Sequence, residues 1–417
     1  AIAETMLAAH FNREGFPVVD HRTYAVCGDG CMMEGISSEA AALAGTLKLS
    51  KLTLLYDDND ISIEGNTDIA LREDVGARFA AYGWNVIRVA DGNDYTQVLS
   101  ALNAAKTSDR PTLIICPTVI GFGCTAKQGK ACAHGEPLGE ENLLAAAKAL
   151  GMPEAPFTVL PEVYAHCEEI ANKNADAQKA WDKLFEAYSE KYPELKAEWD
   201  VWFSDELPDS VALNDALWHY DGKAATRATS GDMINRLAKL LPNLVGGSAD
   251  LAPSNKTNIK DGGDYSAENR AGRNMHFGVR EHGMAAICNG MALHGGLRVF
   301  CGTFFVFTDY MRPAVRLAAL MNLDSVFVWT HDSVGVGEDG PTHQPIEHLA
   351  AMRAIPGLAI VRPSDANETS VAWGEILRRT DAPAGIILSR QDLPIFSRGD
   401  KLASAEGVVR GGYVLSE

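Results

Sequence analysis

Long apolar runs and a surplus of basic residues are both missing from this sequence of 417 residues. No stretch of eighteen apolar residues occurs and no secretory signal is recognisable, so the cytoplasm is the expected location and no membrane partner is expected. Lysine and arginine number 37 against 55 aspartates and glutamates, which gives a net charge of −18. Nucleic acids bind basic surfaces, so no nucleic acid is expected as a partner. A phosphorylated substrate would require a local cluster of arginine and histidine.

Cysteine is scarce as well. The eight cysteines include Cys27 and Cys31, which flank a Gly-Asp-Gly turn, but no second pair stands at the spacing of a zinc site. Reduced thiols are therefore expected rather than disulfides or structural zinc. Apolar side chains are plentiful at 46% of all residues, which is enough to form more than one core. We expect two or three domains.

The clearest pattern in the chain is a strand, a glycine turn, a helix, a second strand and an asparagine. Tyr24–Cys27 is apolar and indicates a buried strand, after which Gly28-Asp29-Gly30 allows a sharp turn that presents a carboxylate. Helical spacing of apolar residues predicts a helix over Glu34–Leu47, and Leu52–Tyr56 is predicted to be the next strand. Parallel strands joined by a crossover helix end at the same edge of a sheet, so the aspartate and Asn59 are expected to lie close together.

An oxygen-only metal site is the chemistry that Asp29 and Asn59 suggest. A carboxylate, an amide oxygen and a nearby backbone carbonyl suit a hard cation such as Mg²⁺, with Ca²⁺ or Mn²⁺ as alternatives, and a diphosphate would supply further oxygens. The alternative is an ordinary Gly-Asp-Gly turn with Asn59 capping a loop, and for the tripeptide alone that interpretation is favoured. The surrounding pattern of strand, helix, strand and asparagine favours the metal site.

The alternation of helix and strand continues to about residue 150. Strands are predicted at 86–89 and 112–116 and a helix at 95–105, which is the pattern of a doubly wound parallel sheet. The polar, glycine-rich loop 117–139 is too long to be a simple connection, so a functional role is expected for it.

Three further segments follow the first α/β domain, 1–150. Residues 151–222 are predicted to form a helical linker, and a second α/β alternation occupies 223–395. Segment 396–417 is expected to be a connector that ends in the first strand of a further domain, at Gly411–Glu417. The sequence starts inside a helical pattern without a capping residue, which suggests that the chain is a fragment.

Three groups in the second half are candidates for chemistry. Glu281 begins a helix rich in small residues, where stabilisation by the helix dipole is the simpler interpretation. Phe304, Phe307 and Tyr310 recur every three residues, which favours ordinary core packing on one helix face. Segment 330–343 carries two histidines and three acids after a predicted strand. So polar a segment is poor packing material, and a functional role is favoured there.

Several motifs together carry a resemblance to a known family. G-D-G-C-M-M-E-G, followed after about thirty residues by Y-D-D-N-D-I-S-I, resembles the thiamine diphosphate signature. G-G-S-A-D-L-A-P-S-N and T-H-D-S-V-G-V-G-E-D-G-P-T-H-Q-P are similar to transketolases in particular. The resemblance implies two tandem doubly wound parallel-sheet domains that bind thiamine diphosphate and are joined by a helical linker. It also implies that the amino-terminal part of the first domain and the carboxyl-terminal domain of a transketolase are absent.

The resemblance further implies roles for individual residues. The metal would be held by Asp29, Asn59 and Ile61. Cofactor contacts are implied for Gly28, Asp29, Gly30, Asn59, Ile63, His134, Asp250, Glu281, Phe304, Phe307 and Tyr310. The implied catalytic groups are Glu281, His343, His134 and Glu34. Substrate contacts are implied for Arg227, Ser254, His331, Asp339, His343 and Arg390.

The implied reaction is the transfer of a two-carbon ketol unit from a ketose phosphate, such as xylulose 5-phosphate, to an aldose phosphate, such as ribose 5-phosphate. In the family this proceeds through a thiamine diphosphate ylide and an enamine, in a homodimer whose active sites lie at the subunit interface. The pentose phosphate pathway and carbon fixation both remain open as the setting. Dihydroxyacetone synthase, 1-deoxyxylulose 5-phosphate synthase and a non-catalytic fragment that dimerises or binds cofactor remain alternatives.

Overall fold

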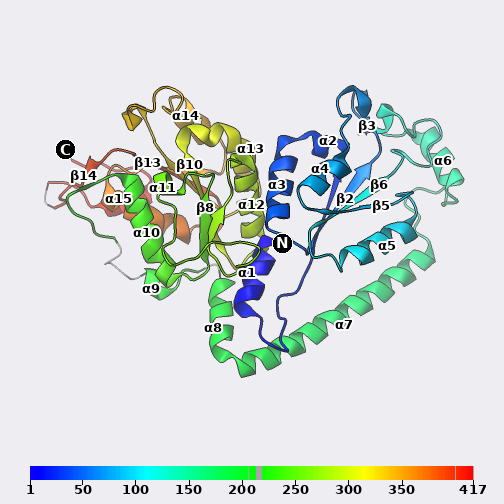
Figure 1. Cartoon of the computed structure of the whole chain (residues 1–417), viewed down its shortest axis with the longest axis horizontal. Helices are drawn as coiled ribbons and strands as arrows, with labels where there is room; N and C mark the ends of the chain where they lie inside the picture. Colours follow the sequence, from blue (N-terminus) through cyan, green and yellow to red (C-terminus); the bar gives the residue numbers. More distant parts are fainter. Residues whose placement is uncertain (205, 213–217, 400, 417) are drawn as a thin grey trace. The chain divides into compact units, whose positions relative to one another are not determined.

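The structure is a computed structural model that describes residues 1–204, 206–212, 218–399 and 401–416 (Figure 1). The chain forms two compact units. Unit 1 contains Ala1 and Asn12–Pro193, and unit 2 contains Ile2–Phe11 and Glu194–Glu417. The division therefore falls inside the segment 151–222 that the sequence predicts to be a helical linker.

Unit 1 is built on a four-stranded sheet with the order β1-β2-β6-β5, in which every pair is parallel. The strands are β1 (Thr23–Gly28), β2 (Leu52–Asp58), β5 (Asn85–Arg88) and β6 (Thr112–Pro117). The helices are α2 (Asp29–Met33), α3 (Gly35–Thr46), α4 (Val75–Ala81), α5 (Tyr95–Ala105), α6 (Glu140–Ala149) and α7 (Pro161–Lys191). A hairpin of β3 (Ile61–Ser62) and β4 (Gly65–Asn66) follows β2. Gly28 lies opposite Asp57, so β1 and β2 end level with each other.

The strand β1 lies at the edge of its sheet. The expectation of a buried strand is wrong here, because Val26 is 76% exposed and Tyr24 is exposed as well. In the described part of unit 1, β1 has a neighbouring strand, β2, on one side only. The strand β6 lies between β2 and β5, and its Leu113 and Ile114 are fully buried. Apolar residues predict a strand but do not say which strand lies at an edge.

Unit 2 is built on a six-stranded sheet with the order β12-β13-β11-β10-β8-β9, again parallel throughout. The strands are β8 (Leu244–Ser248), β9 (Asn274–His276), β10 (Arg298–Phe304), β11 (Val326–Thr330), β12 (Ala359–Val361) and β13 (Ala384–Leu388). The helices are α1 (Ile2–Phe11), α8 (Pro193–Trp202), α9 (Asp209–Ala212), α10 (Thr226–Leu240), α11 (Ala252–Asn255), α12 (Glu281–His294), α13 (Thr308–Leu320), α14 (His348–Arg353) and α15 (Ala366–Arg378). A short antiparallel pair is formed by β7 (Lys223–Ala224) and β14 (Leu393–Pro394). Both units thus have the α/β architecture with parallel sheets that the sequence predicts.

Large aromatic side chains fill the core of unit 2. Trp329 on β11 and Trp373 on α15 are fully buried, and the ring of Phe300 packs against Trp373 with centroids 6.5 Å apart. Gly385 on the neighbouring strand β13 makes room for Trp329, because a Cβ at this position would lie 2.1 Å from the indole ring. A larger residue at this position would force the sheet apart.

Segment 411–416 is not a strand, so the expectation of a strand over Gly411–Glu417 is wrong for its described residues, while Glu417 lies outside them. Side-chain bonds hold this segment instead. The hydroxyl of Tyr413 donates to Glu368 at 2.5 Å and accepts from Arg398 at 2.6 Å. The carbonyl of Leu415 accepts from the backbone N–H of Ala403. Across the described residues, no helix combines the length and the apolar character needed to cross a membrane.

Candidate functional site

Asp29 and Asn59 meet at the carboxyl edge of β1 and β2. Asp29 is the first residue of α2 and is only 3% exposed. The hydroxyl of Tyr56 donates to Asp29 Oδ1 at 2.6 Å, and the backbone N–H of Asn59 donates to Asp29 Oδ2 at 3.3 Å. The structure therefore brings the two residues together where an open α/β sheet binds its ligands.

The side chain of Asn59 and the hairpin after it complete this edge. Asn59 Oδ1 accepts from the backbone N–H of Ile61 at 3.0 Å, and Asn59 Nδ2 donates to Asp57 Oδ2 at 3.4 Å. Asp60 adopts the left-handed backbone conformation, with φ of 59°. This turn leads into β3, and Ile63 lies exposed between the two strands of the hairpin.

Four aspartates lie at or just after the ends of β1 and β2, namely Asp29, Asp57, Asp58 and Asp60. Burial raises the pKa of Asp58, and the charges of Asp29 and Asp60 act in the same direction. The hydroxyl of Thr118 donates a short hydrogen bond to Asp57. Surplus negative charge on oxygen ligands is what a hard divalent cation offsets, so these residues fit Mg²⁺ or a similar ion.

Gly28 and Gly30 keep space open next to Asp29. Gly28 caps α2 with φ of −112°, and neither glycine has a positive φ, so the turn does not need the conformational freedom that the sequence suggested. The chain instead passes from β1 directly into α2. A Cβ on Gly30 would meet no atom within 4 Å, and one on Gly28 would meet only the Asp57 carbonyl oxygen at 3.9 Å. Both positions therefore allow a ligand to approach the backbone closely.

Glu34 and His134, the remaining candidates in unit 1, are both exposed. Glu34 lies between α2 and α3, and His134 follows a short 3₁₀ turn, Ala131–Ala133. In the described part of the chain, neither side chain makes a hydrogen bond to Asp29 or Asn59.

Because Asp29 is a candidate metal ligand, replacing its hydrogen-bond donor Tyr56 with phenylalanine is expected to weaken metal binding about 10- to 100-fold, the usual cost of removing a group that orients a ligand. Burial raises the pKa of Tyr56, so its hydroxyl stays protonated and serves as the donor to Asp29. Loss of this bond should also lower the free energy of unfolding by about 1.5–3 kcal/mol. Mg²⁺ titration in the presence of thiamine diphosphate, followed by tryptophan fluorescence, measures the first effect. Tyr95→Phe, at an exposed position on α5, is the matched control, and equal metal affinities in the two variants would contradict this role of Tyr56.

The candidates of unit 2 gather where four neighbouring strands end. Phe304 is the last residue of β10, His331 directly follows β11, and Arg390 follows β13 by two residues. Ser254 lies on α11 after β8, and Arg227 lies in the first turn of α10. The order β13-β11-β10-β8 in the sheet makes these strand ends adjacent.

Aromatic rings form one side of this cluster. The rings of Phe304 and Phe307 stack with centroids 5.9 Å apart, and Phe307 and Tyr310 lie 6.1 Å apart. His343 packs against Phe307 at 5.4 Å. The three aromatic residues come from the end of β10, a 3₁₀ turn (Phe305–Phe307) and α13, so they do not share one helix face as the spacing suggested. Core packing describes the buried Phe304 but not Tyr310, which is 63% exposed.

Arginines form the other side of the cluster. Arg227 Nη1 donates to the carbonyl oxygen of Ser254 at 2.9 Å and lies 3.5 Å from His331 Nε2. Arg390 lies 3.7 Å from Glu338 and 3.8 Å from Asp339. Burial, followed by the charge of Arg390, lowers the pKa of Arg227. Two arginines that disfavour each other's charge suit an anionic ligand such as a phosphate.

Glu281 and Asp250 occupy two further positions in unit 2. Glu281 is the buried first residue of α12, where the helix dipole favours a carboxylate. Asp250 follows β8 with a left-handed φ of 60°, which is uncommon for a residue other than glycine.

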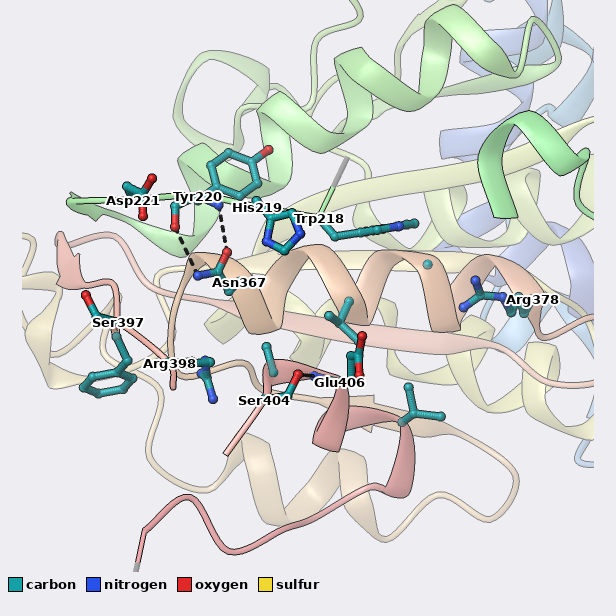
Figure 2. A pocket seen from close by; sticks show the side chains of 15 residues that line it. Trp218, His219, Tyr220, Asp221, Asn367, Arg378, Ser397, Arg398, Ser404 and Glu406 are labelled. Atoms are coloured by element: carbon teal, nitrogen blue, oxygen red, sulfur yellow. Dashed lines mark hydrogen bonds between the residues drawn. The ribbon is translucent and has the colours of Figure 1, made fainter. Parts of the chain in front are cut away.

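A separate cavity lies beside α15 and contains none of the candidate residues (Figure 2). Asn367 is paired with the backbone of Tyr220 through two hydrogen bonds, of 2.8 and 3.1 Å. Arg398 bonds Asp365 at 3.1 Å and Glu368 at 3.3 Å. Asn367 and Arg398, two polar residues of the cavity wall, thus bond neighbouring parts of unit 2.

Family models match both halves of the chain. The model for "Transketolase, thiamine diphosphate binding domain" matches residues 1–208, and the model for "Transketolase, pyrimidine binding domain" matches residues 222–395. The chain belongs to the transketolase family.

Individual transketolases agree with this assignment. The chain is 49% identical over 419 residues to the transketolase of Geobacillus stearothermophilus and 48% identical over 420 residues to that of Bacillus subtilis, in both cases with 100% of this chain and 63% of the relative covered. The chain thus spans somewhat less than two thirds of the length of these relatives.

Solved transketolase structures match it closely. The Leishmania mexicana transketolase has a TM-score of 0.94 at 43% identity, with 98% of this chain and 60% of that chain covered. A Pichia stipitis transketolase in complex with sedoheptulose 7-phosphate has a TM-score of 0.95 at 42% identity, with 99% and 62% covered.

Two residues that support the candidate site, Tyr56 and Thr330, were not singled out from the sequence. Tyr56 bonds Asp29, and Thr330 bonds both Asn255 and His331. The sequence signal for Thr330 was its position next to a candidate histidine, whereas the pairing of Tyr56 with Cys27 is visible in the structure alone. Such signals become specific only when the long-range pairing is known.

Proposed function

We propose that this chain carries transketolase activity, the transfer of a two-carbon ketol unit from a ketose phosphate to an aldose phosphate. The observation that carries the proposal is the contact between Asp29 and Asn59 at two adjacent strand ends, within residues that match a thiamine diphosphate-binding domain. Pichia stipitis transketolases have been solved with xylulose 5-phosphate and with sedoheptulose 7-phosphate, which supports sugar phosphates as the substrate class. Ribose 5-phosphate is the proposed acceptor.

In unit 1, Asp29 and Asn59 with the backbone carbonyl of Ile61 would hold a divalent cation, proposed to be Mg²⁺ and replaceable by Ca²⁺ or Mn²⁺. The cation would in turn bind the diphosphate of thiamine diphosphate. The other proposed cofactor contacts in this unit are Gly28, Gly30, Ile63 and His134.

In unit 2, Glu281 would hold a proton at a ring nitrogen of the aminopyrimidine. Its burial at the start of α12 supports this role, because a carboxylate that shares a proton needs a site with little water. Phe304, Phe307 and Tyr310 would stack on the ring, and Asp250 would lie near the thiazolium. When bound, thiamine diphosphate supplies the electron sink that stabilises a two-carbon carbanion.

The arginine side of the cluster would bind the sugar phosphate. Arg227 and Arg390, with Ser254 and His331, would form the phosphate end of the substrate site. Asp339 would bind a substrate hydroxyl. Proton transfer to the reacting oxygens of the sugar is proposed for His343, with His134 and Glu34 as further catalytic candidates.

We also propose a homodimer, in which Glu281 and the aromatic rings of one subunit serve the metal site of the other. Leu293 on α12 and Leu317 and Leu320 on α13 are exposed apolar side chains. Their exposure supports an interface that includes these two helices. The proposed location is the cytoplasm, which suits eight cysteines that are all unpaired.

Titration of the protein with thiamine diphosphate in the presence of Mg²⁺, followed by circular dichroism, tests cofactor binding. A coupled assay with xylulose 5-phosphate and ribose 5-phosphate tests transfer. The proposal expects saturable binding that requires the metal, together with two-carbon transfer. Binding without transfer would overturn the catalytic part and favour a non-catalytic cofactor-binding chain, and absence of both would overturn the whole proposal.

A further inference from the structure

A histidine and two carboxylates from separate segments of unit 2 meet at the start of α13. Asp309 lies in the first turn of α13, and Glu347 directly precedes His348, the first residue of α14. The helices α13 and α14 contact each other. The ligand atoms that the three side chains offer all lie within 4.8 Å of one another. None of the three is a candidate for binding the cofactor or the sugar phosphate, so the proposed function leaves this cluster without a role.

The contact between His348 and Asp309 decides which ring nitrogen carries the proton. His348 Nε2 lies 3.1 Å from Asp309 Oδ2, and an ionised carboxylate can only accept a hydrogen bond. In the neutral ring the proton is therefore on Nε2, and Nδ1 keeps its lone pair. A carboxylate that accepts from one ring nitrogen is also the usual companion of a histidine that binds a metal through the other, because it orients the ring and strengthens the ligand.

The Nδ1 atom of His348 has no hydrogen-bond partner among the described residues, although only 4% of the side chain is exposed. Buried polar atoms are nearly always paired, so one that is not paired points to a missing ligand or ion. Glu347 Oε2 faces Nδ1 at 3.8 Å, which is too long for a hydrogen bond. A lone pair and a carboxylate repel each other at this distance unless a cation lies between them.

We propose that His348 Nδ1 and the carboxylate of Glu347 bind one divalent transition-metal ion, such as Zn²⁺, and that Asp309 orients the imidazole. Zinc binds imidazole nitrogen at about 2.0–2.1 Å and carboxylate oxygen at about 2.0–2.2 Å. Two such bonds together are longer than the gap of 3.8 Å, so one ion reaches both atoms with a bent angle between its bonds. The side chain of Glu347 is 72% exposed, so water can occupy the other coordination positions.

The types of ligand select a different cation from the one proposed for unit 1. Mg²⁺ and Ca²⁺ take oxygen ligands, whereas imidazole nitrogen suits zinc, copper, nickel and iron. The cluster contains no cysteine, so the spacing of cysteines in the sequence gave no sign of it. Arg312 is a cation beside the cluster, and its Nη2 lies 3.5 Å from Asp309 Oδ1. This is the carboxylate oxygen that does not face His348, so Arg312 leaves Nδ1 accessible to the ion.

Equilibrium dialysis of the full chain against Zn²⁺, with Mg²⁺ in fixed excess, tests the site in solution. Glu347→Gln removes a ligand at an exposed position, and Glu268→Gln, at another exposed glutamate of unit 2, is the matched control. Removing a group that only orients a ligand costs about 10- to 100-fold in metal affinity, so loss of the ligand itself should cost at least tenfold. The proposal predicts that Glu347→Gln loses one equivalent of zinc and that the control binds as much as the unmodified chain. Zinc held by cysteines is the same in all three proteins, so equal binding by the two variants would overturn the proposal.

Asp309→Asn tests the orienting role of Asp309. Zinc affinity should fall about 10- to 100-fold while both ligands remain in place, and Asp381→Asn, at an exposed aspartate of unit 2, should leave it unchanged. Equal affinities in these two variants would remove Asp309 from the site. If Asp309→Asn fails to fold, the dialysis of Glu347→Gln and the position of the ion in crystals decide.

Crystals soaked with Zn²⁺ and measured at the zinc absorption edge locate the ion. The proposal predicts an anomalous peak between His348 Nδ1 and the carboxylate of Glu347. A peak on the Nε2 side of the ring, or no peak at this cluster, would overturn the assignment. Neither dialysis nor diffraction requires turnover or thiamine diphosphate, so the zinc site and the proposed transketolase activity can each fail without the other.

Discussion

Replacing Glu281 with glutamine is expected to lower kcat for two-carbon transfer about 10²- to 10⁴-fold, the range typical of a lost acid–base group. Glutamine has the shape of glutamate but cannot hold the proton that the aminopyrimidine nitrogen requires. Glu281 is buried at the start of α12, so water does not readily replace it. The coupled assay with xylulose 5-phosphate and ribose 5-phosphate at saturating cofactor measures this effect.

Glu268→Gln is the control for this variant, because Glu268 is an exposed glutamate in the same unit and is not a candidate site residue. It should leave kcat within about twofold, as surface substitutions usually do. Turnover by Glu281→Gln at the rate of the control would remove Glu281 from the catalytic machinery. Thermal unfolding of both proteins shows whether the loss is chemical or structural.

Asp29→Asn is expected to lower affinity for the divalent cation more than 100-fold. Loss of a residue that merely orients a metal ligand costs about 10- to 100-fold, and Asp29 is proposed as the ligand itself. Asparagine keeps an oxygen that accepts from Tyr56, so the fold should survive the change. Mg²⁺ titration at fixed thiamine diphosphate, followed by tryptophan fluorescence, gives the affinity.

Asp109→Asn is the matched control, at an exposed aspartate elsewhere in unit 1. It removes the same charge from the unit but should leave metal affinity unchanged. Equal loss in both variants would mean that overall charge, rather than ligation at Asp29, governs binding.

The sequence predicted most elements of the fold because their signals are local. Helix α5 was expected over 95–105 and has these bounds in the structure, and β6, expected over 112–116, runs one residue further. The short strand β9 and helix α14 were not expected, because three to six residues offer little periodicity. The exposure of Val26 depends on which strands flank β1, which is a long-range property that composition does not encode.

The site shows the same division between local and long-range information. Asp29 and Asn59 could be placed together because a strand, a helix and a strand fix their relation. Tyr56 and Thr330 could not be recognised, because their roles depend on partners 27 residues away for Tyr56 and 75 residues away for Thr330. Supporting hydrogen bonds have no spacing rule, so the residues that orient a site are the hardest to find in a sequence.

Crystals of the protein soaked with Mn²⁺ and thiamine diphosphate test the central claim most directly, because Mn²⁺ replaces Mg²⁺ at oxygen sites and scatters anomalously. An anomalous peak within coordination distance of the carboxylate of Asp29, the amide oxygen of Asn59 and the carbonyl of Ile61 is the predicted result. A bound diphosphate whose metal lies elsewhere, or no metal at this edge of the sheet, would contradict the account.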